Sequence, residues 1–466
     1  MKRTKTYTAA MATASVALLA GVSAANAQMP VVCSSTQISP AKNDCVMPTA
    51  TAPGGGNFPG SFMVPGTTTS VAIHGYIQFD IIRDMGPHFG DTATFAPVLE
   101  GVGVTNSGAS AHALNGGTDM GVKATRPNVE TRTPTAYGEL KTYIEFDFNQ
   151  TAGTQLAGNN DILRLRQAYG TLGPWLMGQT YSLFADPLAF ADTAAGGQDV
   201  GMMNTANARK PGIRYTWLAG NGITIAGSAE QESFAANTAG TIAANATAAS
   251  AAAASTAIAL NETTVFTNLP RFIAAAQWDQ PWGHLKLAAG GGATDVRQNN
   301  ILAGGTSATP NHQVGDWALA LSGHLNTWGK DTLRGGFEYF NGAMDLQSWV
   351  GQGSFVENVT AGTVKLTKAW AGYANYEHFF TNKWRANESF GYTRASGNPF
   401  SVACTGGTAC PQAALTKVFF TNNLNVIYAP VPQADFILEW QHAYRQMMSG
   451  ASGTANQIDA QFKFYF

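Results

Sequence analysis

Segments of roughly ten residues in which apolar and polar side chains alternate recur along most of the chain. Residues 71–82 read VAIHGYIQFDII and residues 137–149 read YGELKTYIEFDFN, with apolar side chains at alternate positions. A β-strand sends successive side chains to opposite faces, so each segment separates an apolar medium from a wet one. About ten residues is also the length of a tilted strand that crosses a bilayer. The pattern predicts strands whose apolar faces meet either a protein core or lipid.

The same alternation predicts sixteen strands along the chain. Their ranges are 71–84, 119–133, 137–149, 162–170, 175–184, 210–218, 222–233, 269–279, 282–292, 313–327, 330–341, 363–379, 383–395, 415–429, 433–447 and 456–466. In the fourth strand, Leu163, Leu165 and Tyr169 are expected on one face, and Arg164 and Arg166 on the other.

The connections between these strands alternate strictly between short and long. Short ones lie at 134–136, 173–174, 219–221, 280–281, 328–330, 381–382 and 429–432. Long ones lie at 85–118, 150–160, 185–209, 234–268, 293–312, 342–362, 396–414 and 448–455. A soluble β-sandwich has no reason to place every long loop at one end, whereas an outer-membrane barrel has short periplasmic turns and long extracellular loops. The predicted fold class is therefore all-β, a transmembrane antiparallel β-barrel of 16 strands with both chain ends on the periplasmic side.

Aromatic residues support a membrane location. Six of the ten tryptophans lie within five residues of a predicted short turn, namely Trp175, Trp217, Trp278, Trp282, Trp328 and Trp384. This clustering favours an aromatic girdle at a membrane interface over tryptophans that merely pack near strand ends.

An unpaired strand edge is costly in lipid, so the last strand, 456–466, is expected to pair with the first, 71–84. Its terminal Phe466 looks like the signal that the barrel-assembly machinery reads.

The first 27 residues have the layout of a secretory signal peptide. A basic start with Lys2, Arg3 and Lys5 is followed by an apolar stretch, 9–22, and by Ala-Asn-Ala at 25–27. Its removal would change the formal net charge from −2 to −5, which gives no reason to expect a nucleic-acid partner. No later segment has the roughly 18 consecutive bulky apolar residues of a transmembrane helix.

Motifs for catalysis or metal binding are not found. The cysteines form two local pairs, Cys33 with Cys45 and Cys404 with Cys410, and in an exported protein two disulfides are favoured over a metal site. The histidines are scattered over different strands and loops, so no metal is expected. The chain has no G-x-S-x-G nucleophile elbow and no phosphate-binding P-loop. We therefore expect neither an enzyme nor a bound cofactor.

Four segments of the chain together resemble the sequences of a known protein family. They are FMVPGTTTSVAIHGYIQFDIIRD (62–84), ETRTPTAYGELKTYIEFDFN (130–149), LRLRQAYGTLGPWLMGQTYSLFADP (163–187) and the terminal FKFYF. Together they resemble the DcaP-like porins of Gram-negative outer membranes, most clearly over 61–84 and 119–215. The resemblance implies a homotrimer of 16-stranded barrels that passes small anionic solutes such as dicarboxylic acids, with the third external loop folded into the lumen. Some members carry a helical periplasmic extension, which the Pro- and Gly-rich stretch 28–60 does not match.

Basic residues on the wet faces of the strands form the candidate site. Strand parity assigns to the channel wall Arg126, Arg132, Lys141, Arg164, Arg166, Arg214 and Arg271. A row of guanidinium groups suits carboxylate or phosphate oxygens and would attract anions. The third long loop, 185–209, contains Asp186, Asp192 and Asp199, and folded inward it would set these acids opposite the arginines. The alternative is that the arginines only neutralise acids of the lumen.

These inferences give three parts: a signal peptide (1–27), a short periplasmic segment (28–69) and a barrel (70–466) with a constriction loop at 185–209. The predicted function is passive diffusion of small hydrophilic, anionic (carboxylate) solutes through a porin of the cell outer membrane. Expected partners are two further copies in a homotrimer, outer-membrane lipid and lipopolysaccharide, the barrel-assembly machinery and small anionic solutes. The rival hypotheses are an outer-membrane barrel enzyme that hydrolyses lipid or peptide, and a closed structural or adhesive barrel that works through loop 234–268.

Overall fold

The computed structural model describes the barrel strands and several of the segments that join them. The described residues are 55–87, 115–150, 162–194, 209–232, 263–266, 269–298, 312–346, 355–358, 363–396, 416–447, 450 and 452–466. The predicted signal peptide, Asp199 and the cysteines Cys33, Cys45, Cys404 and Cys410 lie outside them. None of the helices within these ranges is long and apolar enough to cross a membrane.

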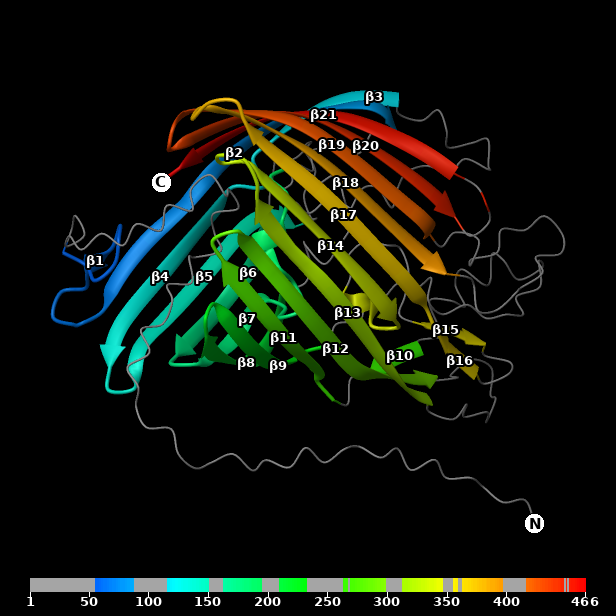
Figure 1. The fold of residues 1–466 in the computed structure, drawn as a ribbon, viewed down its shortest axis with the longest axis horizontal. Helices are drawn as coiled ribbons and strands as arrows, with labels where there is room; N and C mark the ends of the chain where they lie inside the picture. The colour runs from blue at the N-terminus through cyan, green and yellow to red at the C-terminus, as the bar shows by residue number, and fades with distance from the viewer. Residues whose placement is uncertain are drawn as a thin grey trace, which may run out of the picture.

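Sixteen antiparallel strands close into a barrel within the described part of the chain, as the sequence predicts (Figure 1). Fourteen of them are continuous: β2 (Ser70–Pro87), β5 (Gly138–Gln150), β6 (Ile162–Leu172), β7 (Trp175–Tyr181), β8 (Arg209–Gly220), β9 (Ile223–Glu230), β12 (Gly283–Gln298), β13 (His312–Asn326), β14 (Thr332–Asn341), β17 (Lys368–Phe379), β18 (Trp384–Ser396), β19 (Thr416–Val431), β20 (Ala434–Met447) and β21 (Ser452–Tyr465).

The second and eighth strands are each drawn as two pieces. The second consists of β3 (Asn115–Gly121) and β4 (Arg126–Thr135), which pair with successive parts of β2. The eighth consists of β10 (Thr263–Phe266) and β11 (Arg271–Gln280), which pair with successive parts of β12. Short elements complete the fold: β1 (Phe62–Met63), the hairpin of β15 (Phe355–Asn358) and β16 (Thr363–Leu366), and the 3-10 helices η3 (Pro187–Ala189) and η5 (Met344–Leu346).

The last strand closes the barrel against the first, as the lipid argument predicts. β21 pairs with β2 from Tyr76 opposite Tyr465 to Asp84 opposite Gln457. Beyond this ladder, Gly75 exchanges two backbone hydrogen bonds with Phe466, of 3.2 and 3.1 Å. The C-terminus therefore lies beside the blue N-terminal strand in Figure 1.

Side chains alternate across the barrel wall as expected for a bilayer on one side and a wet lumen on the other. On the outside, Ile73 is 55% exposed and Leu438 is 59% exposed, although both are apolar. On the inside, Asp80, Glu439 and Asp459 are almost fully buried and face other polar groups or loop segments of the lumen. Because Asp459 and Gln461 face the lumen, the alternate apolar residues of the terminal strand, Ile458, Phe462 and Phe464, lie on the lipid-facing side.

One side of the lumen is filled by an apolar cluster that strand parity does not predict. The inward positions of β9 to β13 hold small residues, including Ala226, Ala275, Ala288, Ala318 and Ala320. Leu183 and Phe184 of the loop after β7, and Met344 and Leu346 of η5, pack against them. These strands are therefore apolar on both faces, and two inward-folded segments occupy this side of the channel.

Candidate functional site

Strand β6 holds two arginines beside the acidic residues of β5. Arg164 is fixed by Asp147, whose carboxylate oxygens lie 2.8 and 2.7 Å from Nε and Nη2. Arg166 is fully buried and lies 2.8 Å from Glu145 and 2.9 Å from Asp147. Two carboxylates thus compensate the charge of these two arginines.

A β-bulge in β6 changes the face of the residues that follow it. The register between β5 and β6 shifts between Glu145 and Phe146, and Arg166 and Gln167 are both buried although they are adjacent. The expectation that Tyr169 shares a face with Leu165 is therefore wrong. The Tyr169 ring lies 5.4 Å from the ring of the buried Tyr143. A period of two cannot reveal this change, because the extra residue reverses the alternation.

Two further arginines lie beside this pair without a carboxylate. Arg126 on β4 is 8% exposed, and its guanidinium group lies 5.3 Å from the centre of the Tyr76 ring. Arg209 at the start of β8 lies 5.6 Å from the centre of the Tyr181 ring. Within the described residues, neither arginine has an ion-pair partner within 4.0 Å, and the buried atoms Arg126 Nε and Arg209 Nη1 have no hydrogen-bond acceptor.

We call Arg126, Arg164, Arg166 and Arg209 the basic cluster. Arg209 is within electrostatic range of the other three. Against four guanidinium groups stand the carboxylates of Glu145 and Asp147, which leaves two positive charges uncompensated among the described residues. Arg166 Nη2 also has no acceptor there. The cluster can therefore offer donors and net positive charge to an anion.

The other basic residues predicted on the early strands, Arg132, Lys141 and Arg214, lie outside the basic cluster and have acceptors of their own. Arg132 and Lys141 share Glu130, at 2.6 and 2.8 Å. Arg214 donates to the Tyr181 carbonyl at 2.6 Å and lies 3.9 Å from Glu230.

Arg271 belongs to a different, fully buried network. It contacts Glu232 at 2.5 Å, Asp316 at 2.7 Å and Asp345 at 2.9 Å. Lys210 forms a further ion pair with Asp345. The network ties the ends of β8, β9, β11 and β13 to η5, so its arrangement indicates a structural role rather than solute contact.

The loop after β7 runs along the inside of the wall and contacts strands that are distant in sequence. Asp186 accepts hydrogen bonds from His284 Nε2 at 3.2 Å and from Ser322 Oγ at 2.6 Å. Burial opposes ionisation of Asp186, but these hydrogen bonds and the charges of His284 and Lys286 lower its pKa to about 2. Ala194 bonds Glu439 through its N–H at 2.8 Å. The loop is thus anchored to the wall on both sides of η3.

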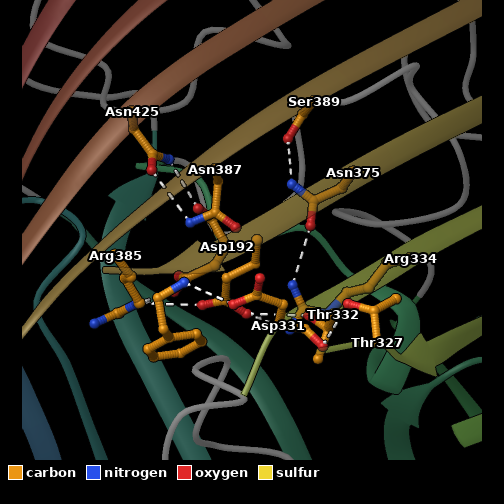
Figure 2. A network of polar contacts seen from close by, with 12 residues as sticks. Asp192, Thr327, Asp331, Thr332, Arg334, Asn375, Arg385, Asn387, Ser389 and Asn425 are labelled. Atoms are coloured by element: carbon orange, nitrogen blue, oxygen red, sulfur yellow. Dashed lines mark hydrogen bonds and ion pairs between the residues drawn. The ribbon is translucent and has the colours of Figure 1, made fainter. Parts of the chain in front are cut away.

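Asp192 lies opposite a basic residue that the sequence did not single out. Its carboxylate lies 2.9 Å from Arg385 Nη2 on β18, as Figure 2 shows. The same figure shows Arg334, Asn375 and Ser389 linked in a row along the neighbouring strands. The expectation that the loop acids face the early-strand arginines is therefore wrong for Asp192 and for Asp186, because wall residues of later strands neutralise both.

Residues missed by the sequence reasoning are mainly Arg209, Arg334 and Arg385. Parity on β14 and β18 places Arg334 and Arg385 on the same face as their buried polar neighbours, and that signal was available. Parity could not place Arg209, because it and the adjacent Lys210 both contact residues of the lumen at the beginning of β8: Arg209 lies over the Tyr181 ring and Lys210 pairs with Asp345. Within the described residues, no group of three His, Cys, Asp or Glu side chains could hold a metal ion.

Comparison with known proteins agrees with this architecture. Residues 59–464 match the family model described as "Porin subfamily". No curated protein sequence matches the chain. The outer membrane channel DcaP of Acinetobacter baumannii has a similar fold, with a TM-score of 0.65 and 16% identity over 87% of this chain and 99% of that one.

Two further solved structures are more distant. An anion-selective porin from Comamonas acidovorans has a TM-score of 0.48 and 9% identity, over 85% of this chain and all of that one. The trimer form of OmpT from Vibrio cholerae has a TM-score of 0.47 and 10% identity, over 86% of this chain and all of that one. The family match spans most of the chain and agrees with the closed barrel, so the protein belongs to the Porin subfamily and is an outer-membrane β-barrel channel.

Proposed function

We propose that this channel conducts small hydrophilic anions, carboxylates in particular, by passive diffusion, and that it does so as a homotrimer exported by a cleaved signal peptide. The observation that carries the anion preference is the uncompensated charge of the basic cluster. Arg126 and Arg209 keep donors without acceptors among the described residues, whereas Arg164 and Arg166 are held by carboxylates. A planar guanidinium fork binds a carboxylate through two parallel hydrogen bonds.

The inward-folded loop would narrow the channel without neutralising the basic cluster. Its acids are neutralised by His284 and Arg385 on later strands, and its Leu183 and Phe184 pack on the apolar wall. A solute in the channel would therefore still meet the net positive charge of the basic cluster on β4, β6 and β8. In this proposal the loop acids do not compete with anions for these arginines.

Planar-bilayer recording tests the proposal. The wild-type protein should insert with conductance steps in multiples of three and give an anion-selective reversal potential across a KCl gradient. The double variant Arg126→Gln/Arg209→Gln should lose most of this selectivity, because each charge contributes about 1 kcal/mol to a contacting anion in a wet pore and more in a drier one. The matched control is Arg83→Gln, which removes a charge from an exposed residue on the outer side of β2. A cation-selective wild-type channel, or a double variant as selective as Arg83→Gln, would refute the anion proposal.

A further inference from the structure

Four polar side chains lie on the outer, lipid-facing side of β18 to β21. They are Glu388, Asn422, His442 and Asn456, which we call the polar face. Asn422 is opposite His442 in the ladder, and His442 is opposite Asn456, so three of them form a row across adjacent strands. Their neighbours on the same side are exposed and apolar: Phe390 is 45% exposed, Leu424 48% and Leu438 59%.

The polar face lies at a depth where lipid tails would surround it. Trp384 and Tyr428 stack at 4.5 Å near the short-turn end of their strands and mark the interface there. Glu388 lies four residues beyond Trp384, which at about 3.3 Å per residue and a tilt of about 45° is roughly 10 Å of depth. Asn422 lies six residues before Tyr428, or roughly 14 Å of depth by the same arithmetic. Both values fall inside an apolar band about 25 Å tall.

The hydrogen bonds of the polar face leave several groups without a partner on their own chain. His442 Nδ1 and Asn456 Oδ1 are 2.9 Å apart, and Asn422 Nδ2 donates to the Ser389 carbonyl at 3.1 Å. In the part of the chain that the structure describes, the Glu388 carboxylate has neither an ion pair nor a hydrogen bond, and only the Glu388 backbone carbonyl accepts one from a side chain, that of Asn375. A carboxylate and amides facing lipid are costly, so such residues mark a surface that other protein covers.

A second set of outward hydroxyl groups lies on the other side of the barrel closure. Thr131 on β4 and Thr142 on β5 are paired in the ladder, with 2.6 Å between their hydroxyl oxygens. Each threonine is about five residues from the short turn that joins β4 to β5. Glu388 is also about five residues from the short turn that precedes β18. The threonine pair and the Glu388 carboxylate therefore lie at similar depths. A hydroxyl donor is the partner that a carboxylate needs in a lipid environment.

We infer that the polar face of one copy contacts the outer side of β4 and β5 of the next copy in a closed ring of three. This inference rests on the proposed trimer and names its contact surface. In a cyclic ring each subunit contacts its two neighbours through two different patches. In a ring of three, the directions from one barrel axis to the two neighbouring barrels differ by about 60°, so the two patches are about a sixth of the barrel circumference apart. In a sixteen-stranded barrel a sixth is about three strands, which is the separation from β20, the strand of His442, through β21 and β2 to β4. Glu388 on β18 lies two strands farther away, at the edge of the contact.

Site-specific photo-crosslinking in cells tests this contact on the full chain without disturbing its cysteines. A benzoyl-phenylalanine replacing His442 should yield an adduct of two chains, and its peptide map should join position 442 to β4 or β5. The matched control replaces Leu319, an outward residue of β13 that is 46% exposed, and should yield no chain-to-chain adduct. Adducts from position 319 but not 442, or only lipid adducts from position 442 in a trimeric preparation, would overturn the inference.

A substitution experiment separates failure of the contact from failure of the channel. The triple variant Glu388→Leu/His442→Leu/Asn456→Leu gives this face an ordinary lipid-facing composition. It should insert as folded barrels that retain anion-selective conductance, but the trimer band on a semi-native gel should fall at least tenfold. The control Leu319→Ala should keep the wild-type trimer band. A triple variant that remains fully trimeric would contradict the inference, while a wild-type protein that conducts but is monomeric would overturn the trimer proposal itself.

Discussion

Removing Arg271 should release η5 from the wall of the barrel. Arg271 is the central cation of a buried network in which two cations, Arg271 and Lys210, face three acidic side chains. The substitution Arg271→Met keeps much of the side-chain volume but removes the cation that Glu232 and Asp316 contact, and it leaves Asp345 with Lys210. Breaking a buried ion pair on one side costs about 3–5 kcal/mol, because the remaining charge stays desolvated.

The expected loss of local stability can be measured as the hydrogen-exchange rate of a single backbone amide, that of Leu346. The Leu346 N–H donates to Ala343 at 3.0 Å inside η5, next to Asp345, so it exchanges with solvent only when this turn opens. At about 1.4 kcal/mol per factor of ten, a loss of 3–5 kcal/mol raises the opening constant by roughly 150-fold to several thousandfold. Hydrogen–deuterium exchange of the folded barrel in detergent should show a rate increase of that order.

A control and a rescue make the Arg271 prediction specific. Arg334→Met removes another buried arginine, which contacts Glu377 at 2.7 Å, and should leave exchange at Leu346 unchanged. Adding Glu232→Gln to Arg271→Met should restore part of the protection, since it removes an acidic side chain whose ion-pair partner is Arg271, whereas Asp345 keeps its ion pair with Lys210. If Arg271→Met changed the exchange rate at Leu346 by less than about tenfold, the reasoning from desolvated charge would be refuted.

Two other perturbations have definite expected outcomes. Gly75→Val should reduce the amount of folded barrel, seen as the heat-modifiable band on a gel. Gly75 has a φ of 154°, and a Cβ at this position would lie 2.4 Å from the Arg126 carbonyl oxygen. The control is Gly315→Ala, whose added Cβ meets nothing within 4 Å and which should fold normally. Glu232 should make stability depend on pH: burial raises its pKa from 4.5 to about 8, so the folded state holds the proton more tightly, and its contribution is complete below pH 4.5 and lost as pH rises toward 8. Thermal unfolding of Glu232→Gln should lack this decline, and an unchanged decline would assign it to other groups.

The strands could be predicted from the sequence because lipid imposes a strict rule on them. A closed barrel must send every second side chain to the bilayer, so Ile73, Leu438 and Phe464 are exposed apolar residues at intervals that a reader of the sequence can count. Closure of β21 on β2 followed from the same rule, since an open edge is not tolerated in hydrocarbon. The bulge at Arg166 and the strands β9 to β13, which are apolar on both faces, could not be predicted in this way, because an alternation with a period of two reveals neither.

The charge balance of the lumen could not be predicted from the sequence. Parity gave the face of Arg164 and Arg166 but not the fact that Glu145 and Asp147, on the next strand, reach them. It also gave no means to see that a loop far from β18 would bring Asp192 to Arg385. Pairings of this kind depend on strand shear and on the path of a loop, and both are properties of the closed barrel.

The path of the loop after β7 explains why a lumen rich in both signs of charge can still prefer one kind of solute. If Asp186 and Asp192 had faced Arg126 on β4 and Arg209 on β8, they would have neutralised the two arginines that have no carboxylate partner among the described residues. Instead Asp186 lies against His284 of β12 and Asp192 against Arg385 of β18. The apolar packing of Phe184 on the alanine-rich wall holds the loop on that side. The selectivity that we propose therefore depends on packing as much as on charge, because the packing decides which arginines remain open to the solute.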